Sequence, residues 1–167
     1  NQIMDYEKFE RKKLNLNLSK ENVANIIKQV SETHKKKLKE SKQRIKVTWE
    51  EELILKIDTD LFKQVCHNLI WNFLKYAWKK SRLTINITKN YINFSDDWNW
   101  IKGSEVQFVW EKFYQWNIEK SWDASKRWIW VWLSIIDKII RSHGWESRIK
   151  SEKSKGFSYA AHSIIPD

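Results

Sequence analysis

The stretch DTDLFKQVCHNLIWNFLKYA (58–77) has the apolar periodicity of a partly buried helix. Asp58 or Thr59 can cap its start, because a side-chain oxygen at that position accepts a hydrogen bond from a free backbone N–H group. The helix is expected to continue to about Ala77. Its buried face is expected to consist of Leu61, Phe62, Val65, Leu69, Phe73 and Leu74.

Three polar residues interrupt this apolar helix. Asn68 and Asn72 are four residues apart and therefore share a helix face, and Lys75 stays near that face. An asparagine carbonyl oxygen can bind Mg²⁺, and a lysine ammonium can bind phosphate. Two helix-surface amides with ordinary partners are the alternative, so this helix by itself does not establish a site.

The composition is that of one domain of ordinary size. The chain has 167 residues, with 41% hydrophobic and 31% charged residues and a net charge of +10. No apolar run approaches about 18 residues, and the charged opening NQIMDYEKFERKK does not resemble a signal peptide. The single Cys66 excludes an internal disulfide and is expected to be buried in a protein of a reducing compartment.

Much of the positive charge lies in KKKLKESKQRIK (35–46) and RKK (11–13). Such runs are typical of solvated helix ends and loops, although a net charge of +10 also suits a phosphate-rich partner. Twelve tryptophans beside basic runs could stack on single-stranded nucleic acid. A non-catalytic binding module is therefore the alternative function class.

Strands and helices are expected in mixed order, which favours a two-layer α/β sandwich of one mixed β-sheet with about three helices on one face. Further helices are expected at 2–11, after a cap at Ser19, near 105–114 and at about 129–142, the last ended by Gly144. Strands are expected at 14–18, 44–48, 52–57, 82–88, 91–96, 147–152 and 157–165. The pairs 44–48 with 52–57 and 82–88 with 91–96 are expected to form hairpins.

Further motifs follow the helix motif along the chain. After NLIWNFLKYA (68–77) come DDWNWI (96–101), VWEKFYQ (109–115) and RWIWVWL (127–133), followed by HGW (143–145) and KSKGFSYAAHSIIP (153–166). In this order and spacing, the first four segments resemble the N box, first glycine box, F box and second glycine box of the ATP-binding catalytic domain of sensor histidine kinases. The last two resemble the His-Gly-Gly and the closing hairpin of the same domain. This family is part of the GHKL ATPase superfamily, and the resemblance implies its Bergerat-type ATP-binding fold.

The resemblance implies a role for each matching residue. Asn72 would bind Mg²⁺, Asn68 would orient the reacting group, and Asp97 would accept a hydrogen bond from the adenine amino group. The remaining nucleotide contacts implied are Lys75, Tyr76, Trp98, Trp100, Lys126, Arg127, Trp128, Trp130, Trp132 and Leu133. Asp97 and Asn72 are expected to face one cleft, and 98–127 is expected to be its loosely ordered lid.

The resemblance also implies a longer protein. None of the four histidines lies in the family's His-Glu-x-Arg context, and His34 is expected at the surface. Residues 1–13 are therefore expected to be a connector at the end of a dimerisation helix, and 14–167 the catalytic domain. The domain would transfer the γ-phosphoryl group of Mg-ATP to a histidine on the dimerisation domain, and a response regulator would be the next partner. We expect a cytoplasmic domain without membrane or nucleic-acid contact, in a protein that can be membrane-anchored through other segments.

The tryptophans depart from the family pattern. Glycine is expected about a dozen times in a chain of this length but occurs three times. The family has glycine at the positions of Trp98, Trp100, Trp128, Trp130, Trp132 and Trp145. Glycine there supplies positive φ and lets backbone amides approach phosphate. Either tryptophan replaces glycine in a kinase sequence, by design or error, or the chain is a natural pseudokinase, or the aromatic residues form a true stacking surface.

Overall fold

The computed structural model of the chain describes residues 13–50, 52–77, 79–96, 124–152 and 156–163. The helices in this part are α2 (Val23–Thr33), α3 (Lys35–Ser41), α4 (Thr59–Tyr76) and α6 (Ala124–Ser142). The strands are β1 (Leu18–Asn22), β2 (Arg44–Trp49), β3 (Ile54–Asp58), β4 (Arg82–Ile87), β5 (Tyr91–Ser95), β6 (Trp145–Glu152) and β7 (Gly156–Ser163).

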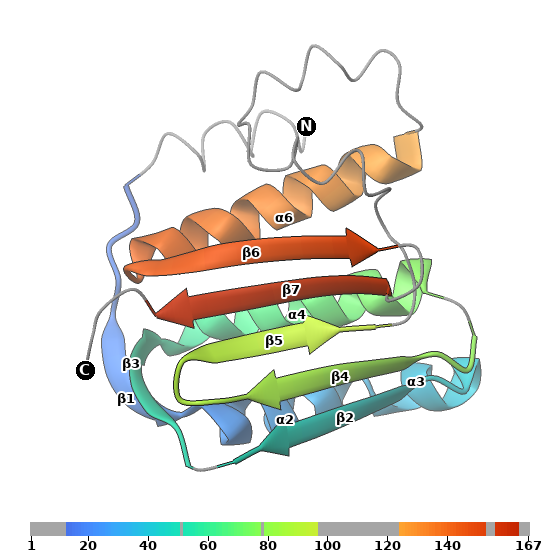
Figure 1. Cartoon of the computed structure of the whole chain (residues 1–167), viewed down its shortest axis with the longest axis horizontal. Helices are drawn as coiled ribbons and strands as arrows, with labels where there is room; N and C mark the ends of the chain where they lie inside the picture. The colour runs from blue at the N-terminus through green and yellow to red at the C-terminus, as the bar shows by residue number, and fades with distance from the viewer. Residues whose placement is uncertain (1–12, 51, 78, 97–123, 153–155, 164–167) are drawn as a thin grey trace.

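The main sheet has five strands in the order β2-β4-β5-β7-β6. Its β2–β4 pair is parallel, and its other pairs are antiparallel. The long helices α2, α4 and α6 all lie on one face of this sheet, with α4 between the other two (Figure 1). The expected two-layer α/β sandwich with a mixed sheet is therefore confirmed. The expected hairpin of 82–88 with 91–96 is confirmed as β4–β5, and β6 and β7 also pair antiparallel.

Helix α4 begins and ends where its sequence predicts. The Asp58 carboxylate caps it, accepting a hydrogen bond from the backbone N–H of Leu61 at 3.1 Å. Burial works to raise the pKa of this carboxyl, but hydrogen bonds from the backbone of Asn17 and Leu61 and the nearby His143 outweigh it and lower the pKa. The cap therefore remains charged at neutral pH and holds the first turn of α4.

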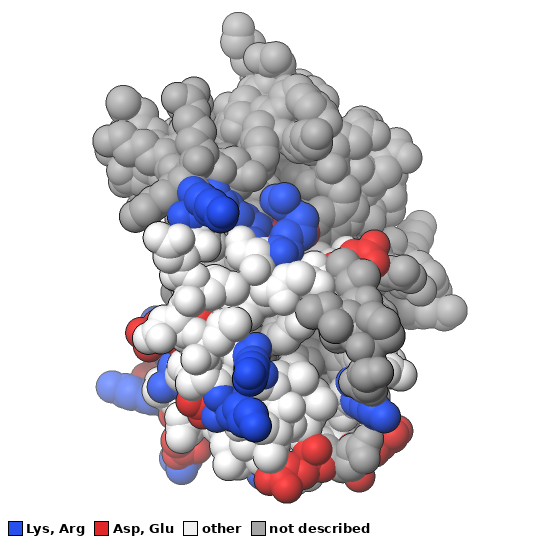
Figure 2. All heavy atoms as spheres, turned by 90° about the vertical axis from the view of Figure 1, so that its left-hand side faces the viewer, with Lys and Arg blue, Asp and Glu red and all other residues white. Residues whose placement is uncertain are grey.

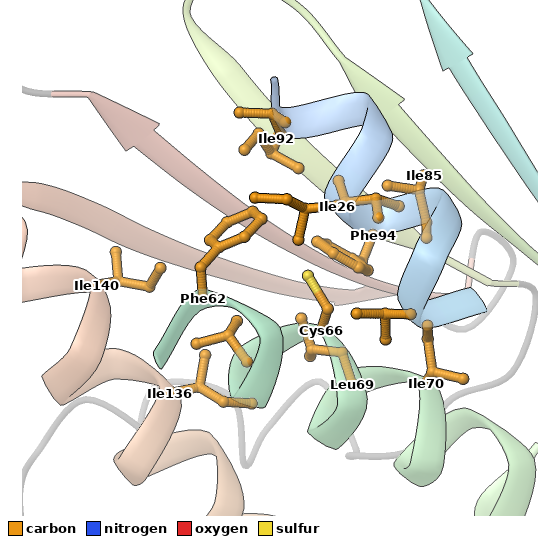
Figure 3. Packing of buried hydrophobic residues seen from close by; sticks show 14 of the residues in the cluster. Ile26, Phe62, Cys66, Leu69, Ile70, Ile85, Ile92, Phe94, Ile136 and Ile140 are labelled. Atoms are coloured by element: carbon orange, nitrogen blue, oxygen red, sulfur yellow. The ribbon is translucent and has the colours of Figure 1, made fainter. Parts of the chain in front are cut away.

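The core lies between α4, its neighbouring helices and the sheet (Figure 3). Apolar side chains of α4 contact partners from α2, β4, β5 and α6, as the periodicity of each element predicts. The best buried include Ile27, Leu69, Ile70, Phe73, Ile85, Leu133 and Ile136. Cys66 is fully buried among them, as expected. Tight packing around α4 makes it a rigid support for the polar residues that it carries.

The beginning of the chain departs from expectation. Strand β1 is Leu18–Asn22, not 14–18, and Asn22 rather than Ser19 caps α2, accepting from the N–H of Asn25 at 3.1 Å. The 44–48 and 52–57 stretches do not form a hairpin. Strand β2 pairs in parallel with β4, and β3 pairs with β1 in a separate two-stranded sheet. The expected hairpin is wrong, because alternation identifies a strand but not the edge of the sheet that it joins.

Helix α6 is longer than expected. It starts at Ala124 instead of about 129, so the whole of RWIWVWL lies inside a helix. Tryptophan, unlike glycine, does not interrupt a helix at these positions. Positive φ in the described residues occurs at Lys42, Lys80 and Gly144, so Trp128, Trp130 and Trp132 do not have glycine-type backbone geometry. The helix does end before Gly144, whose φ is 80°, as expected.

Candidate functional site

One pocket in the helical layer collects the polar residues of α4. It has a volume of about 310 Å³ and lies where the end of α2, the middle of α4 and the first half of α6 meet. Its lining consists of His34, His67, Asn68, Trp71, Asn72 and Trp132. The sequence prediction that Asn68 and Asn72 share a face is confirmed. Both side chains line this one hollow.

The two asparagines have an unusual hydrogen-bonding state. Asn72 is fully buried, and neither its Oδ1 nor its Nδ2 has a hydrogen-bond partner among the described residues. The Nδ2 of Asn68 is likewise buried without one there. A buried amide atom without a partner costs about 1–3 kcal/mol, so each such group calls for an explanation, such as a bound ligand, ion or water. A ligand with polar atoms in the pocket would satisfy both amides.

The chemistry of these donors fits a hydrated magnesium ion with phosphate. Mg²⁺ takes oxygen ligands and keeps several waters, and it commonly shares one or two protein ligands with substrate phosphates. Asn72 Oδ1 supplies such an oxygen, and the amide N–H groups can donate to phosphate oxygens. The residues present therefore fit the Mg²⁺–nucleotide group that the family resemblance implies.

The aromatic lining shapes the pocket. Trp132, from α6, lines the pocket together with the asparagines, at a position where the family has glycine. Trp71 is 38% exposed, and the Lys75 ammonium lies 4.7 Å from the centroid of its ring. Lys75 thus lies over the ring of Trp71 and is not among the residues that line the pocket, and its expected phosphate contact stays a prediction.

The remaining expected contacts are placed only in part. Lys126, Arg127, Trp128 and Trp130 belong to the first turns of α6, and Tyr76 is the last residue of α4. Leu133 is fully buried in the core. Asp97, Trp98 and Trp100 lie outside the described residues, as do residues 1–12 of the connector and the whole region 97–123 with the F box. The expected opposition of Asp97 and Asn72 stays a prediction.

Sequence reasoning missed the histidine side of the pocket. His34, expected at the surface, is partly buried, and its Nε2 lies 2.9 Å from Nδ1 of His67. Burial lowers the pKa of His34, and the neighbouring charges of His67 and Lys37 lower it further. The sequence does indicate the position of His67. His67 and Trp71 are four residues apart, directly beside Asn68 and Asn72, so they lie on a neighbouring strip of the same helix. No local signal connected His34 to them.

The alternative of a nucleic-acid groove gains no support from the face drawn in Figure 2. Basic side chains form separate groups there, with acidic side chains among them. Among the tryptophans with described side chains, Trp71 and Trp132 line the same pocket, but the other two lie apart from them. Trp145 is buried against His143, and Trp49 is 46% exposed with the Lys28 ammonium 3.8 Å from its ring centroid. Within the described ranges, no helix has the length and apolarity needed to cross a membrane.

Curated relatives of the chain are sensor histidine kinases. It is 23% identical over 160 residues to the sensor histidine kinase YclK of Bacillus subtilis (strain 168). The matched region covers 93% of this chain and 33% of YclK. It is 28% identical over 111 residues to the sensor histidine kinase WalK of the same strain, covering 63% and 18%. The chain thus spans a third or less of these relatives. No family model matches it.

Solved histidine kinases have the same fold. The catalytic domain of histidine kinase ThkA superposes with a TM-score of 0.72 at 16% identity, covering 91% of this chain and 100% of that one. A structure of ThkA in complex with the response regulator protein TrrA gives 0.73 at 16% identity, covering 95% and 45%. Full-length ShkA in complex with AMPPNP gives 0.73 at 15% identity, covering 98% and 34%. In fold and motif order, the chain resembles the ATP-binding catalytic domain of sensor histidine kinases.

Proposed function

We propose that this chain is the ATP-binding catalytic domain of a two-component sensor histidine kinase, with residues 1–13 as connector and 14–167 as the domain. The observation that carries the proposal is the fully buried Asn72, whose amide lacks partners among the described residues at the wall of a pocket. The fold shared with histidine kinase catalytic domains supports it, as does the nucleotide analogue in the ShkA structure.

Bound Mg-ATP would supply the phosphoryl group to be transferred. Asn72 would hold the metal through Oδ1, and Asn68 would orient the reacting group from the preceding helix turn. Lys75, Tyr76, Lys126 and Arg127 would neutralise and position the phosphates, and Asp97 would select adenine. Catalysis of phosphoryl transfer rests mainly on such positioning and charge neutralisation, so no protein nucleophile is required in this domain.

The acceptor would be a histidine on a dimerisation domain outside this chain, and the phosphoryl group would then pass to a response regulator. The complex of ThkA with TrrA supports this partner class. The likeness to the cytoplasmic segment of histidine kinase QseC, with a TM-score of 0.71 at 11% identity over 99% of this chain and 92% of that one, supports a cytoplasmic location. Trp132 narrows the pocket at a family glycine position, so nucleotide binding by this sequence is expected to be weak.

The test is calorimetric titration with a non-hydrolysable ATP analogue, with and without Mg²⁺. The chain is compared with a variant in which Trp98, Trp100, Trp128, Trp130 and Trp132 are all changed to Gly. We expect the glycine variant to bind in a Mg²⁺-dependent manner. Asn72→Ala in that variant should remove the Mg²⁺-dependent part, whereas Asn25→Ala, an exposed asparagine on α2, should not.

Adenine selection is tested by Asp97→Asn in the glycine variant. This change should reduce the preference for adenine over guanine nucleotides, because an amide can donate as well as accept. A glycine variant that folds but binds no nucleotide would show that the kinase proposal is wrong. If the tryptophan chain binds as tightly as the glycine variant, the proposed effect of the tryptophans is wrong.

A further inference from the structure

The His34–His67 pair has a geometry that the proposed kinase function does not use. His34 is the residue that follows α2, and His67 lies in the middle of α4, so two packed helices hold the rings. The ring centroids are 5.1 Å apart with an interplanar angle of 62°. Nε2 of His34 and Nδ1 of His67 are 2.9 Å apart, and both rings line the pocket.

The two imidazoles face each other across one hydrogen bond. At a separation of 2.9 Å, one nitrogen carries the hydrogen and the other accepts it. A divalent transition ion that displaces this hydrogen would lie to one side of the line between the two nitrogens, and a small rotation of each ring would turn both lone pairs toward it. Bonds of about 2.0–2.1 Å at a right angle place two nitrogen ligands about 2.9 Å apart, and the tetrahedral angle places them about 3.3 Å apart. The observed separation matches neighbouring ligands of a square-planar or octahedral ion.

We propose that His34 and His67 form a binding site for a divalent transition-metal ion, with Cu²⁺ and Ni²⁺ preferred over Zn²⁺. Imidazole ligands suit these metals, and tetragonal geometry favours Cu²⁺ and Ni²⁺. Within the described residues, no group of three or more His, Cys, Asp or Glu side chains could hold a metal. The pair therefore supplies two ligands, and water or an anion in the 310 Å³ pocket completes the coordination.

The charges around the pair decide which ions it favours. Only a neutral imidazole can bind a metal ion, so metal binding competes with protons. The charge of Lys37 opposes a bound cation, so the site favours ions whose remaining ligands include an anion. This site lines the same pocket as the Mg²⁺ site proposed at Asn72 but differs from it in ligand class, because Mg²⁺ prefers oxygen ligands.

The test uses the chain without a histidine tag and without nucleotide. Ni²⁺ is titrated by calorimetry, and the Cu²⁺ complex is studied by pulsed electron paramagnetic resonance, which counts coordinated imidazoles. We expect one ion per chain and two imidazole nitrogens. His34→Gln and His67→Gln should each weaken Ni²⁺ binding by about tenfold or more, because each removes one of the two protein ligands.

His143→Gln is the matched control. Both ring nitrogens of His143 are already engaged, Nδ1 with the Ile139 carbonyl at 2.7 Å and Nε2 with the Asp58 N–H at 3.0 Å, so this residue should not bind metal. Near-ultraviolet circular dichroism verifies folding, and His34→Gln, at the end of α2, tests the proposal even if His67→Gln does not fold. Unchanged affinity in His34→Gln, or a Cu²⁺ spectrum with fewer than two imidazoles, would overturn the proposal. Since no nucleotide is present, either result leaves the kinase proposal untouched.

Discussion

Replacing Asn72 with leucine should stabilise the nucleotide-free chain. In the structure, both polar atoms of the Asn72 side chain are buried without hydrogen-bond partners among the described residues. Leucine has a similar branched shape without polar atoms, so Asn72→Leu removes a penalty of about 1–3 kcal/mol. For a domain of this size, about 2–4 °C in Tm per kcal/mol gives a rise of about 2–12 °C. The same change should abolish Mg²⁺-dependent nucleotide binding in the glycine variant.

Urea unfolding followed by far-ultraviolet circular dichroism measures the free energy of unfolding. Asn86→Leu is the matched control, because Asn86 Oδ1 accepts a hydrogen bond from the Thr48 hydroxyl at 3.0 Å. It should lower the unfolding free energy by about 0.5–1.5 kcal/mol. If Asn72→Leu lowers it as well, the Asn72 amide has partners in the nucleotide-free protein. The reasoning that it is kept unsatisfied for a ligand would then be refuted.

Three further predictions concern the fold. Changing the tryptophans at 128, 130 and 132 to glycine should unwind the start of α6, because each glycine in a helix costs about 0.8–1.0 kcal/mol relative to alanine. Hydrogen exchange of the backbone amides should then increase at 124–132. The matched triple alanine variant should retain the helix. Asp58→Ala should destabilise the chain by about 0.5–2 kcal/mol through loss of the α4 cap. Because the folded Asp58 pKa is lowered, this difference should be complete above about pH 4 and disappear as the pH falls through the folded value, in urea titrations at several pH values. Cys66 is fully buried, and burial raises the pKa of its thiol, so a thiol reagent should label Cys66 only after the chain unfolds. Rapid labelling of the folded chain would contradict the packing described for α4.

Half of the pocket could be predicted from the sequence, and the other half could not. The spacing of Asn68 and Asn72 places two amides on one side of a helix whose other side is apolar, and helix geometry alone brings them together. His34 lies 33 residues before His67, and only the packing of α2 against α4 brings their rings within hydrogen-bond distance. The lack of hydrogen-bond partners at the Asn72 amide also depends on packing. It can be recognised only when every neighbour of the amide in the folded structure is known.

The sequence by itself determined the elements whose signals are local. Helix α4 follows from the Asp58 cap and a continuous apolar stripe, and the β4–β5 hairpin follows from two alternating segments joined by a short turn. Tertiary structure decided which strands became partners. Strand β2 is nearest in sequence to β3, yet it pairs with β4, because both can then bury apolar side chains under the helices in the main sheet. Hydrogen-bonding and packing partners distant in the chain decide this pairing, and no local pattern records them.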